Sequence, residues 1–237
     1  MRLLVISFLA CFTLVAQADE NWYAKHYQTQ AKSQLISSQA EPVTELYIGK
    51  DRHEDNISML EQGYDLMGTS SFEAADVPPE QALAHGREVK ADKVLVYITK
   101  SRKKTPTGQM EFIREARKSG KELTEKDFQE LPNYRYYATY WAKLPAPLLG
   151  LHVIKLVPKD EDVAPSDGVN VIAVIQGSPA AQAGLQRGDV LLALDGKAVN
   201  RPEELAALVG ELQGQLVPVA IQRDGEVKTL QAQINKR

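Results

Sequence analysis

Three consecutive backbone amides in the second half of the chain could bind an anion. Residues 148–151 read Leu-Leu-Gly-Leu, and inward-pointing N–H groups at Leu149, Gly150 and Leu151 would form a partly positive nest. Such a nest suits the carboxylate at the end of a polypeptide. Gly150 permits the close approach that this contact needs. We therefore expect an anion site that is built from the backbone rather than from side chains.

An apolar segment extends this stretch into a predicted strand. Residues 151–155 read Leu-His-Val-Ile-Lys, and an unpaired edge on them would allow an extended peptide to add to the sheet. Because side chains alternate along a strand, Leu149, Leu151 and Val153 should face one side. His152 should point the other way, where it is either exposed or touches the ligand near its penultimate residue. We favour exposure.

A helix predicted at residues 202–213 could form the opposite wall of a groove. Its buried stripe is predicted from core-like spacing at Leu205, Leu208, Val209 and Leu212. The positions left to face the groove are Glu203, Ala207 and Gly210. Small residues there predict a roomy pocket for an apolar C-terminal side chain. Arg201 stands where a Ser or Thr helix cap is common, so the sequence does not fix the register of this helix.

The serines and histidines show no arrangement typical of catalysis. No serine lies in a Gly-x-Ser-x-Gly turn or in the glycine-rich context of trypsin-like enzymes. The charged run 50–55, which contains His53, is typical of a solvated, acidic helix start rather than of a metal or acid–base cluster. His85 precedes a glycine inside a helical pattern, and we expect it at the surface. We expect no catalytic residue, no metal and no cofactor.

The run 68–72, Gly-Thr-Ser-Ser-Phe, keeps one enzymatic alternative open. It ends a predicted strand in an α/β layer, which is where ligands often bind. It has a single glycine and lacks the Gly-Lys-Ser/Thr ending of a phosphate-binding loop, so an ordinary strand edge is favoured. The alternative function is a hydrolase, or a regulator of a hydrolase, with a site near Ser70 or His53.

Charge and the N-terminus limit the class of protein. The net charge is −3, which argues against a nucleic-acid partner. Residues 1–18 combine Arg2, an apolar run and a small-x-small ending at Ala18, a pattern that predicts a cleaved signal peptide and a periplasmic or secreted protein. No later segment has the apolar length of a transmembrane helix, so we expect no transmembrane span in the mature chain.

Cys11, the only cysteine, offers a second interpretation of the N-terminus. Its surroundings partly resemble a lipoprotein signal, in which the protein would be anchored through Cys11. The apolar run continues past Cys11, which favours cleavage after Ala18. The mature chain then has no disulfide and no cysteine metal ligand.

The elements before Pro145 predict a small α/β domain at residues 19–145. Strand and helix patterns alternate from residue 42 to residue 100 as strand, helix, strand, helix, strand, and an aromatic strand closes the domain before Pro145. We expect this layer to be parallel. A charged insertion at 101–132, with a helix start at 124–127, interrupts the pattern. Residues 20–40 contain no Gly or Pro and predict a helix.

The segment 177–205, GSPAAQAGLQRGDVLLALDGKAVNRPEEL, is the most specific motif in the chain. Ser178 can cap a short helix that begins at Pro179, Leu185 can enter the core, and Asp195-Gly196 can form a tight turn. The segment resembles the central signature of PDZ domains, in the form found in periplasmic high-temperature-requirement (HtrA/Deg) proteases. The resemblance extends over about 148–234 and implies a partly open β-barrel with two helices and a peptide groove.

Together these features predict an α+β chain with a PDZ-like domain at 146–237 and no protease domain. The N-terminal part resembles a small domain of uncharacterised exported bacterial proteins, which implies export but no activity. Our interpretation is a non-catalytic exported adaptor that captures protein C-termini or extended peptides by strand addition. An envelope protease or its substrates are possible partners. A third alternative is that the insertion at 101–132 closes the groove.

Overall fold

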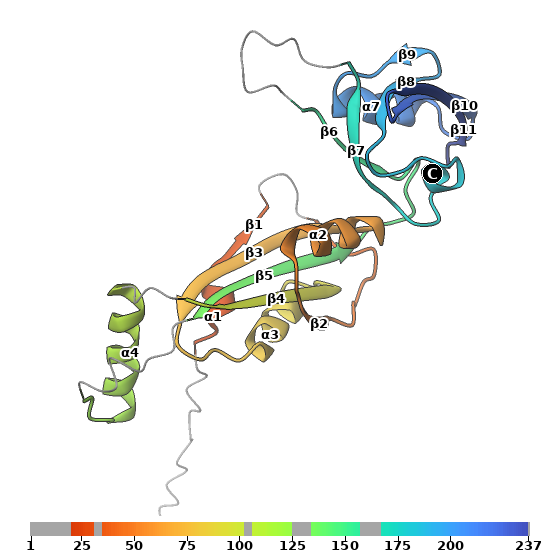
Figure 1. Ribbon diagram of the computed structural model, residues 1–237. Coiled ribbons are helices and arrows are strands. Elements are labelled where there is room, and N and C mark those ends of the chain that lie inside the picture. The colour runs from red at the N-terminus through yellow and green to blue at the C-terminus, as the bar shows by residue number, and fades with distance from the viewer. Residues whose placement is uncertain (1–19, 31–34, 102–105, 125–133, 157–166, 237) are drawn as a thin grey trace, which may run out of the picture.

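Two β-sheets organise the molecule (Figure 1). The structure is a computed structural model, and it describes residues 20–30, 35–101, 106–124, 134–156 and 167–236. The first sheet has five strands in the order β1-β3-β5-β4-β2, and the second has six, in the order β11-β10-β8-β7-β6 with β9 beside β8. The predicted α+β class is confirmed. The predicted signal peptide at 1–18, with Cys11, lies outside the described residues.

The N-terminal sheet is mixed rather than parallel. Its strands are β1 (Tyr27–Thr29), β2 (Glu45–Ile48), β3 (Tyr64–Ala74), β4 (Lys93–Lys100) and β5 (Tyr134–Lys143). Strands β2 and β4 pair in parallel, as the strand–helix–strand pattern predicts. However, β5 is inserted between β3 and β4 and runs antiparallel to both. The aromatic strand that closes the domain therefore becomes the centre of its sheet.

Helices cover both faces of this sheet. On one face, α2 (Arg52–Glu61) places Met59 against Leu95, Tyr97 and Trp141. On the other face, α1 (Trp22–Lys25) and α3 (Glu80–Glu88) cover a larger cluster that contains Tyr23, Phe72, Tyr136 and Tyr140. Alternation along β5 explains why its aromatic residues supply both clusters.

The helix predicted at residues 20–40 is wrong. Asn21 accepts from the N–H groups of Tyr23 and Ala24 at 3.0 and 3.1 Å and starts only the single turn α1. After His26 the chain extends and β1 pairs antiparallel with β3. Backbone pairing to an open sheet edge, together with burial of Tyr23, outweighs the local helical preference.

The insertion contains a helix that the sequence analysis did not predict, α4 (Pro106–Ser119). Figure 1 shows α4 at the end of the N-terminal sheet that lies away from the C-terminal sheet. The described part of the insertion therefore does not close the groove discussed below. Of the helix start predicted at 124–127, residues 125–127 lie outside the described residues.

The C-terminal sheet is antiparallel throughout. Its strands are β6 (Leu151–Ile154), β7 (Val169–Val174), β8 (Val190–Leu194), β9 (Lys197–Ala198), β10 (Leu216–Arg223) and β11 (Glu226–Gln233). Helices α6 (Pro179–Gln182) and α7 (Pro202–Glu211) pack on it. The core cluster includes Leu185, Leu191, Leu205, Val209 and Val219.

The local predictions for the motif at 177–205 are confirmed. The Ser178 hydroxyl accepts from the Ala181 N–H at 3.2 Å and caps α6. Leu185 is buried in the core. Asp195 and Gly196 have φ angles of 50° and 74°, the pair of positive values that a two-residue hairpin turn between right-twisted strands requires.

Candidate functional site

Three consecutive carbonyl groups are fixed in the loop that precedes β6. All three accept hydrogen bonds from N–H groups of other parts of the C-terminal domain. The carbonyls of Leu148, Leu149 and Gly150 accept, in that order, from the N–H groups of Asn235, Ala180 and Ile175, each at 2.9 Å.

These bonds orient the three amides that follow. The described peptide bonds are trans, so each N–H points opposite to the carbonyl of the preceding residue. The N–H groups of Leu149, Gly150 and Leu151 therefore point away from Asn235, Ala180 and Ile175, in that order. Within the described part of the chain, neither Leu149 nor Gly150 donates a backbone hydrogen bond. We call these three amides the amide cradle; that they converge on one anion stays a prediction.

Gly150 is required by its immediate surroundings. Its φ is +90°, a conformation that L side chains rarely adopt. A Cβ at this position would lie 2.2 Å from Cβ of Ser178 and 2.5 Å from its Oγ. Only glycine therefore leaves room for the Ser178 side chain that caps α6.

A groove of about 410 Å³ lies between the edge strand β6 and helix α7. One of its walls contains five of the predicted site residues: Leu149, Gly150, Leu151, His152 and Val153. Among the described residues, β6 ends the sheet and pairs only with β7, so its second edge is unpaired within this part of the chain. The structure therefore brings the amide cradle, an open strand edge and an apolar crevice together. That these residues bind a peptide stays a prediction.

The helical wall of the groove differs from the prediction. Its lining residues are Pro202, Leu205, Ala206 and Val209. The predicted residues Glu203, Ala207 and Gly210 are exposed and do not line the groove. Leu205 and Val209 belong to the core and also line the groove. The sequence analysis assigned both residues to the core alone and so did not expect them at the groove.

The start of α7 explains how the helix forms without a Ser or Thr cap. Pro202 occupies its first turn, where a missing N–H costs nothing. The Glu204 carboxylate reaches back and accepts from the Asn200 N–H at 2.8 Å and from the Arg201 N–H at 3.3 Å. These bonds fix the start of α7, whose first residue, Pro202, lines the groove.

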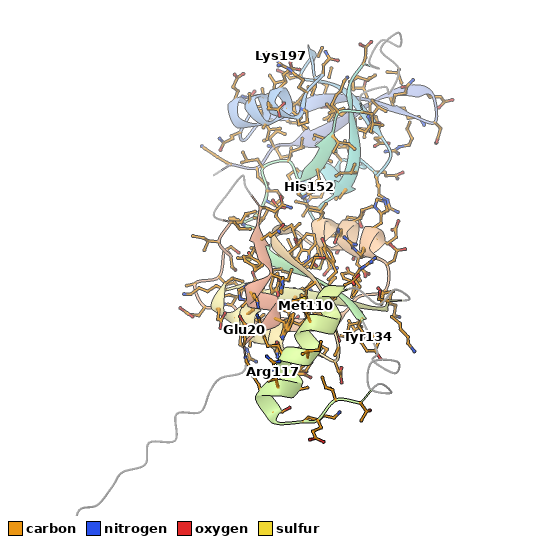
Figure 2. The ribbon with its side chains drawn as sticks, turned by 90° about the vertical axis from the view of Figure 1, so that its left-hand side faces the viewer. Glu20, Met110, Arg117, Tyr134, His152 and Lys197 are labelled. Carbon is orange, nitrogen blue, oxygen red and sulfur yellow. The ribbon has the colours of Figure 1, made fainter. Side chains whose placement is uncertain are left out.

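His152 is half-buried, so the favoured prediction of an exposed side chain is wrong. Its Nε2 atom is buried and has no hydrogen-bond partner among the described residues. Figure 2 shows His152 on the side of the C-terminal domain that faces the N-terminal domain. Burial lowers the pKa of His152, and the nearby Asp65 carboxylate of β3 opposes part of that change. The half-burial of His152 could not be inferred from strand alternation.

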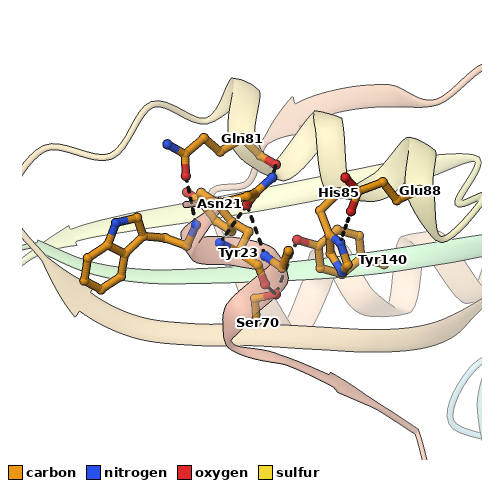
Figure 3. A network of polar contacts seen from close by, with 9 residues as sticks. Asn21, Tyr23, Ser70, Gln81, His85, Glu88 and Tyr140 are labelled. Atoms are coloured by element: carbon orange, nitrogen blue, oxygen red, sulfur yellow. Dashed lines mark hydrogen bonds and ion pairs between the residues drawn. The ribbon is translucent and has the colours of Figure 1, made fainter. Parts of the chain in front are cut away.

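Ser70 and His85 belong to a buried aromatic network (Figure 3). Ser70 is fully buried, and its hydroxyl donates to the Tyr23 carbonyl at 2.7 Å and lies 3.3 Å from the Tyr140 hydroxyl. His85 is 7% exposed and contacts Glu88 through Nδ1 at 3.0 Å. The prediction of a surface His85 is wrong, because its ring packs edge-on against aromatic rings of β1 and β5. Through its bond to the Tyr23 carbonyl, Ser70 of β3 holds α1 on the sheet.

The charged run 50–55 is a helix start, as predicted. The Asp51 side chain accepts from the N–H groups of His53 and Glu54 at 2.9 and 3.1 Å and caps α2. These two bonds lower the pKa of Asp51. Among the residues that the structure describes, no three His, Cys, Asp or Glu side chains are grouped so that they could hold a metal ion. Within the same residues, no helix is long and apolar enough to cross a membrane.

The comparisons with known proteins concern the C-terminal domain. The PDZ domain family model matches residues 147–234. The magnetosome formation protease MamE of Magnetospirillum gryphiswaldense is 44% identical over 64 residues, which are 27% of this chain and 8% of that protein. A probable periplasmic serine endoprotease, DegP-like, of Halomonas elongata is 41% identical over 78 residues, 32% of this chain and 16% of that protein. The chain thus spans less than a fifth of the length of these two relatives.

Solved structures of HtrA proteins align with a similar share of the chain. The HtrA3 PDZ domain bound to a phage-derived ligand is 22% identical with a TM-score of 0.32, and the alignment covers 36% of this chain and 81% of that one. The HtrA-type protease AlgW with a decapeptide is 28% identical with a TM-score of 0.34, covering 38% and 29% of the two chains. With the family match, the sequence relatives establish that residues 147–234 form a PDZ domain that resembles those of the HtrA/DegP proteases.

Proposed function

We propose that this PDZ domain captures the C-terminal ends of other proteins and that the chain is a non-catalytic exported adaptor. The observation that supports the proposal is the amide cradle beside the open edge of β6. A terminal carboxylate accepts hydrogen bonds from the three amides, because a negative charge stabilises such a convergence of N–H groups. The residues before the carboxylate extend along β6 and add a strand to the sheet.

The apolar walls of the groove select the last side chain of the ligand. Leu149, Leu151, Leu205 and Val209 surround the space beside the cradle. A buried apolar side chain contributes roughly 1.5–3 kcal/mol, and each strand hydrogen bond contributes about 0.5–1.5 kcal/mol. Ordering the peptide costs several kcal/mol of conformational entropy. We therefore expect a dissociation constant on the order of micromolar. A protein that binds at this strength recognises its partners and releases them.

The envelope is the proposed location. The relative from Halomonas elongata is a probable periplasmic endoprotease, and residues 1–18 of this chain have the pattern of a signal peptide. Anchoring through Cys11 is the alternative within the same compartment. Partners are therefore proteins of the envelope, among them a protease or its substrates.

The test is a titration of the mature protein, from Asp19 onward, with a library of peptides that end in apolar residues. Each binding peptide is then compared with the same sequence ending in an amide instead of a carboxylate. We expect the amide to bind at least about tenfold more weakly, because it removes the charge that the cradle recognises. Equal binding of the two forms, or no binding by any peptide, contradicts the proposal. Co-purification of envelope proteins with the mature chain then identifies the partners.

The non-catalytic part of the proposal is tested separately. Ser70 donates its hydroxyl to a structural hydrogen bond and is fully buried, which supports a role other than that of a nucleophile. We expect the mature chain to show no turnover in a screen of ester, peptide and phosphoester substrates. Turnover that is lost in Ser70→Ala or His53→Gln would instead establish the hydrolase alternative.

A further inference from the structure

Two adjacent amides connect the peptide groove to the N-terminal domain. The N–H of Ile175 donates to the Gly150 carbonyl at 2.9 Å and so holds one peptide group of the amide cradle. The N–H of the next residue, Gln176, donates to the Glu61 carbonyl at 2.8 Å. Glu61 is the last residue of α2, in the N-terminal domain. A single stretch of two residues is thus bonded to the cradle on one side and to α2 on the other.

The side chain of Ile175 is packed against the same part of the N-terminal domain. Ile175 is 8% exposed, and its Cγ2 lies 3.4 Å from the position that a Cβ would take on Gly63. Gly63 follows α2 and has a φ of +77°. The described contacts place Ile175 outside the core cluster of the C-terminal domain. Its burial therefore depends on the N-terminal domain.

Charged groups also lie at this junction between the two domains. His152 of β6 is half-buried and lies within electrostatic reach of Asp65 of β3. An exposed ion pair of 3.1 Å between Arg187 and Glu54 closes the rim of the same junction. The N-terminal domain therefore contacts the loop after β7, and that loop holds the Gly150 carbonyl at the groove.

We infer that the N-terminal domain positions the peptide site, with Ile175 as the positioning residue. This inference rests on the proposed peptide binding. The Gly150 carbonyl cannot rotate without breaking its bond to the Ile175 N–H, and Ile175 cannot move without separating from Gly63. A cradle fixed before the ligand arrives spares the ligand the cost of ordering it. Because coupling between sites is reciprocal, a bound peptide also tightens the junction.

The experiment compares Ile175→Ala with Ile175→Val in the mature full-length chain. Alanine removes the Cγ2 methyl that contacts Gly63, whereas valine keeps it. We expect Ile175→Ala to bind a carboxylate-ended peptide about five- to tenfold more weakly and Ile175→Val to bind within about twofold of the unaltered chain. Arg187→Ala is the matched control for the exposed rim of the junction, and we expect a change of less than about twofold.

Hydrogen exchange at single amides distinguishes a loss of coupling between the two domains from a general loss of stability. Saturation with peptide should slow exchange of the Gln176 N–H, which lies outside the groove, in the unaltered chain but not in Ile175→Ala. Unchanged affinity in Ile175→Ala, or Gln176 exchange that does not respond to peptide in the unaltered chain, overturns the inference and leaves the proposed function intact.

Two further outcomes are separated by the same design. If the unaltered chain binds no peptide, the proposed function fails, and the positioning role is judged from exchange of the Ile175 N–H, which must be faster in Gly63→Ala than in the unaltered chain. If Ile175→Ala does not fold, Gly63→Ala replaces it, because L side chains rarely adopt the φ of +77° at Gly63, and the strain falls on the turn that borders Ile175. Affinity equal to that of the unaltered chain in Gly63→Ala then overturns the inference.

Discussion

The Asp189 carboxylate and the Arg223 guanidinium form a two-point ion pair in the C-terminal domain. Their Oδ1–Nε and Oδ2–Nη2 distances are 2.6 and 2.8 Å, and the Asp189 side chain is 1% exposed. Burial alone would raise the pKa of Asp189, but the hydrogen bonds from Arg223 and from the Gln186 N–H outweigh it and lower the pKa. The pair ties the corner between α6 and β8 to the end of β10.

Replacing one partner of this pair should destabilise the domain. Asp189→Asn leaves the Arg223 charge without its counter-ion, and we expect the free energy of unfolding to fall by about 3 kcal/mol. Urea unfolding followed by circular dichroism measures the change. Glu211→Gln, which removes a pair to Lys197 with both side chains more than half exposed, is the matched control and should cost less than about 0.5 kcal/mol. Equal losses in the two variants would contradict this account.

The same pair predicts the direction of a pH effect. Because the folded-state pKa of Asp189 is lowered from its ordinary 3.8, the stabilisation is present above that value and is lost as pH falls through the folded-state pKa. The difference in stability between the unaltered chain and Asp189→Asn should therefore be constant near neutrality and shrink below about pH 4. A difference that grows on acidification would show that the sign is wrong.

Gly150 and Ser178 should be energetically coupled. Gly150→Ala combines a positive φ with a Cβ 2.2 Å from Ser178 Cβ, and we expect it to lower the free energy of unfolding by about 3 kcal/mol. Ser178→Gly removes the obstructing atoms and costs about 0.3 kcal/mol through loss of the α6 cap, since glycine is itself tolerated at this position. The double variant should lose less free energy of unfolding than the two single variants lose together. A double-mutant cycle from thermal unfolding measures this coupling, and simple additivity would exclude the clash.

His152 should make the stability of the chain depend on pH near neutrality. Burial, opposed in part by Asp65, lowers its pKa from 6.5 in the folded state, so the unfolded chain binds a proton more readily. Stability therefore decreases as pH falls below about 6.5. Melting temperatures at pH 7.5 and 5.5 should differ less in His152→Leu than in the unaltered chain. The same difference in both proteins would remove His152 as the cause.

Local signals in the sequence predicted most of the C-terminal fold. The Asp-Gly pair at 195–196 takes the positive φ angles that a two-residue turn requires, and Ser178-Pro179 starts α6 as its residue types indicate. The loop that carries the amide cradle could also be located from the sequence, because it contains Gly150 between apolar residues. In each case a few adjacent residues determine the conformation.

Properties set by distant parts of the chain could not be predicted in this way. His85 is buried, and His152 half-buried, by elements far away in the sequence, and no local pattern indicates this burial. The turn α1 and strand β1 form because a sheet edge is available to residues 27–29. The link through Ile175 and Gln176 uses backbone N–H groups, which carry no side-chain signature at all.

The register of α7 gives the sharpest test of the groove. Ala206 lines it and Ala207 does not, although both are exposed on neighbouring positions of one helix. Ala206→Arg places a long charged side chain over the crevice and should weaken peptide binding at least about tenfold. Ala207→Arg should leave affinity within about twofold, since alanine and arginine have similar helix propensities. Isothermal titration with one carboxylate-ended peptide compares the two, and a stronger loss in Ala207→Arg would restore the register inferred from the sequence.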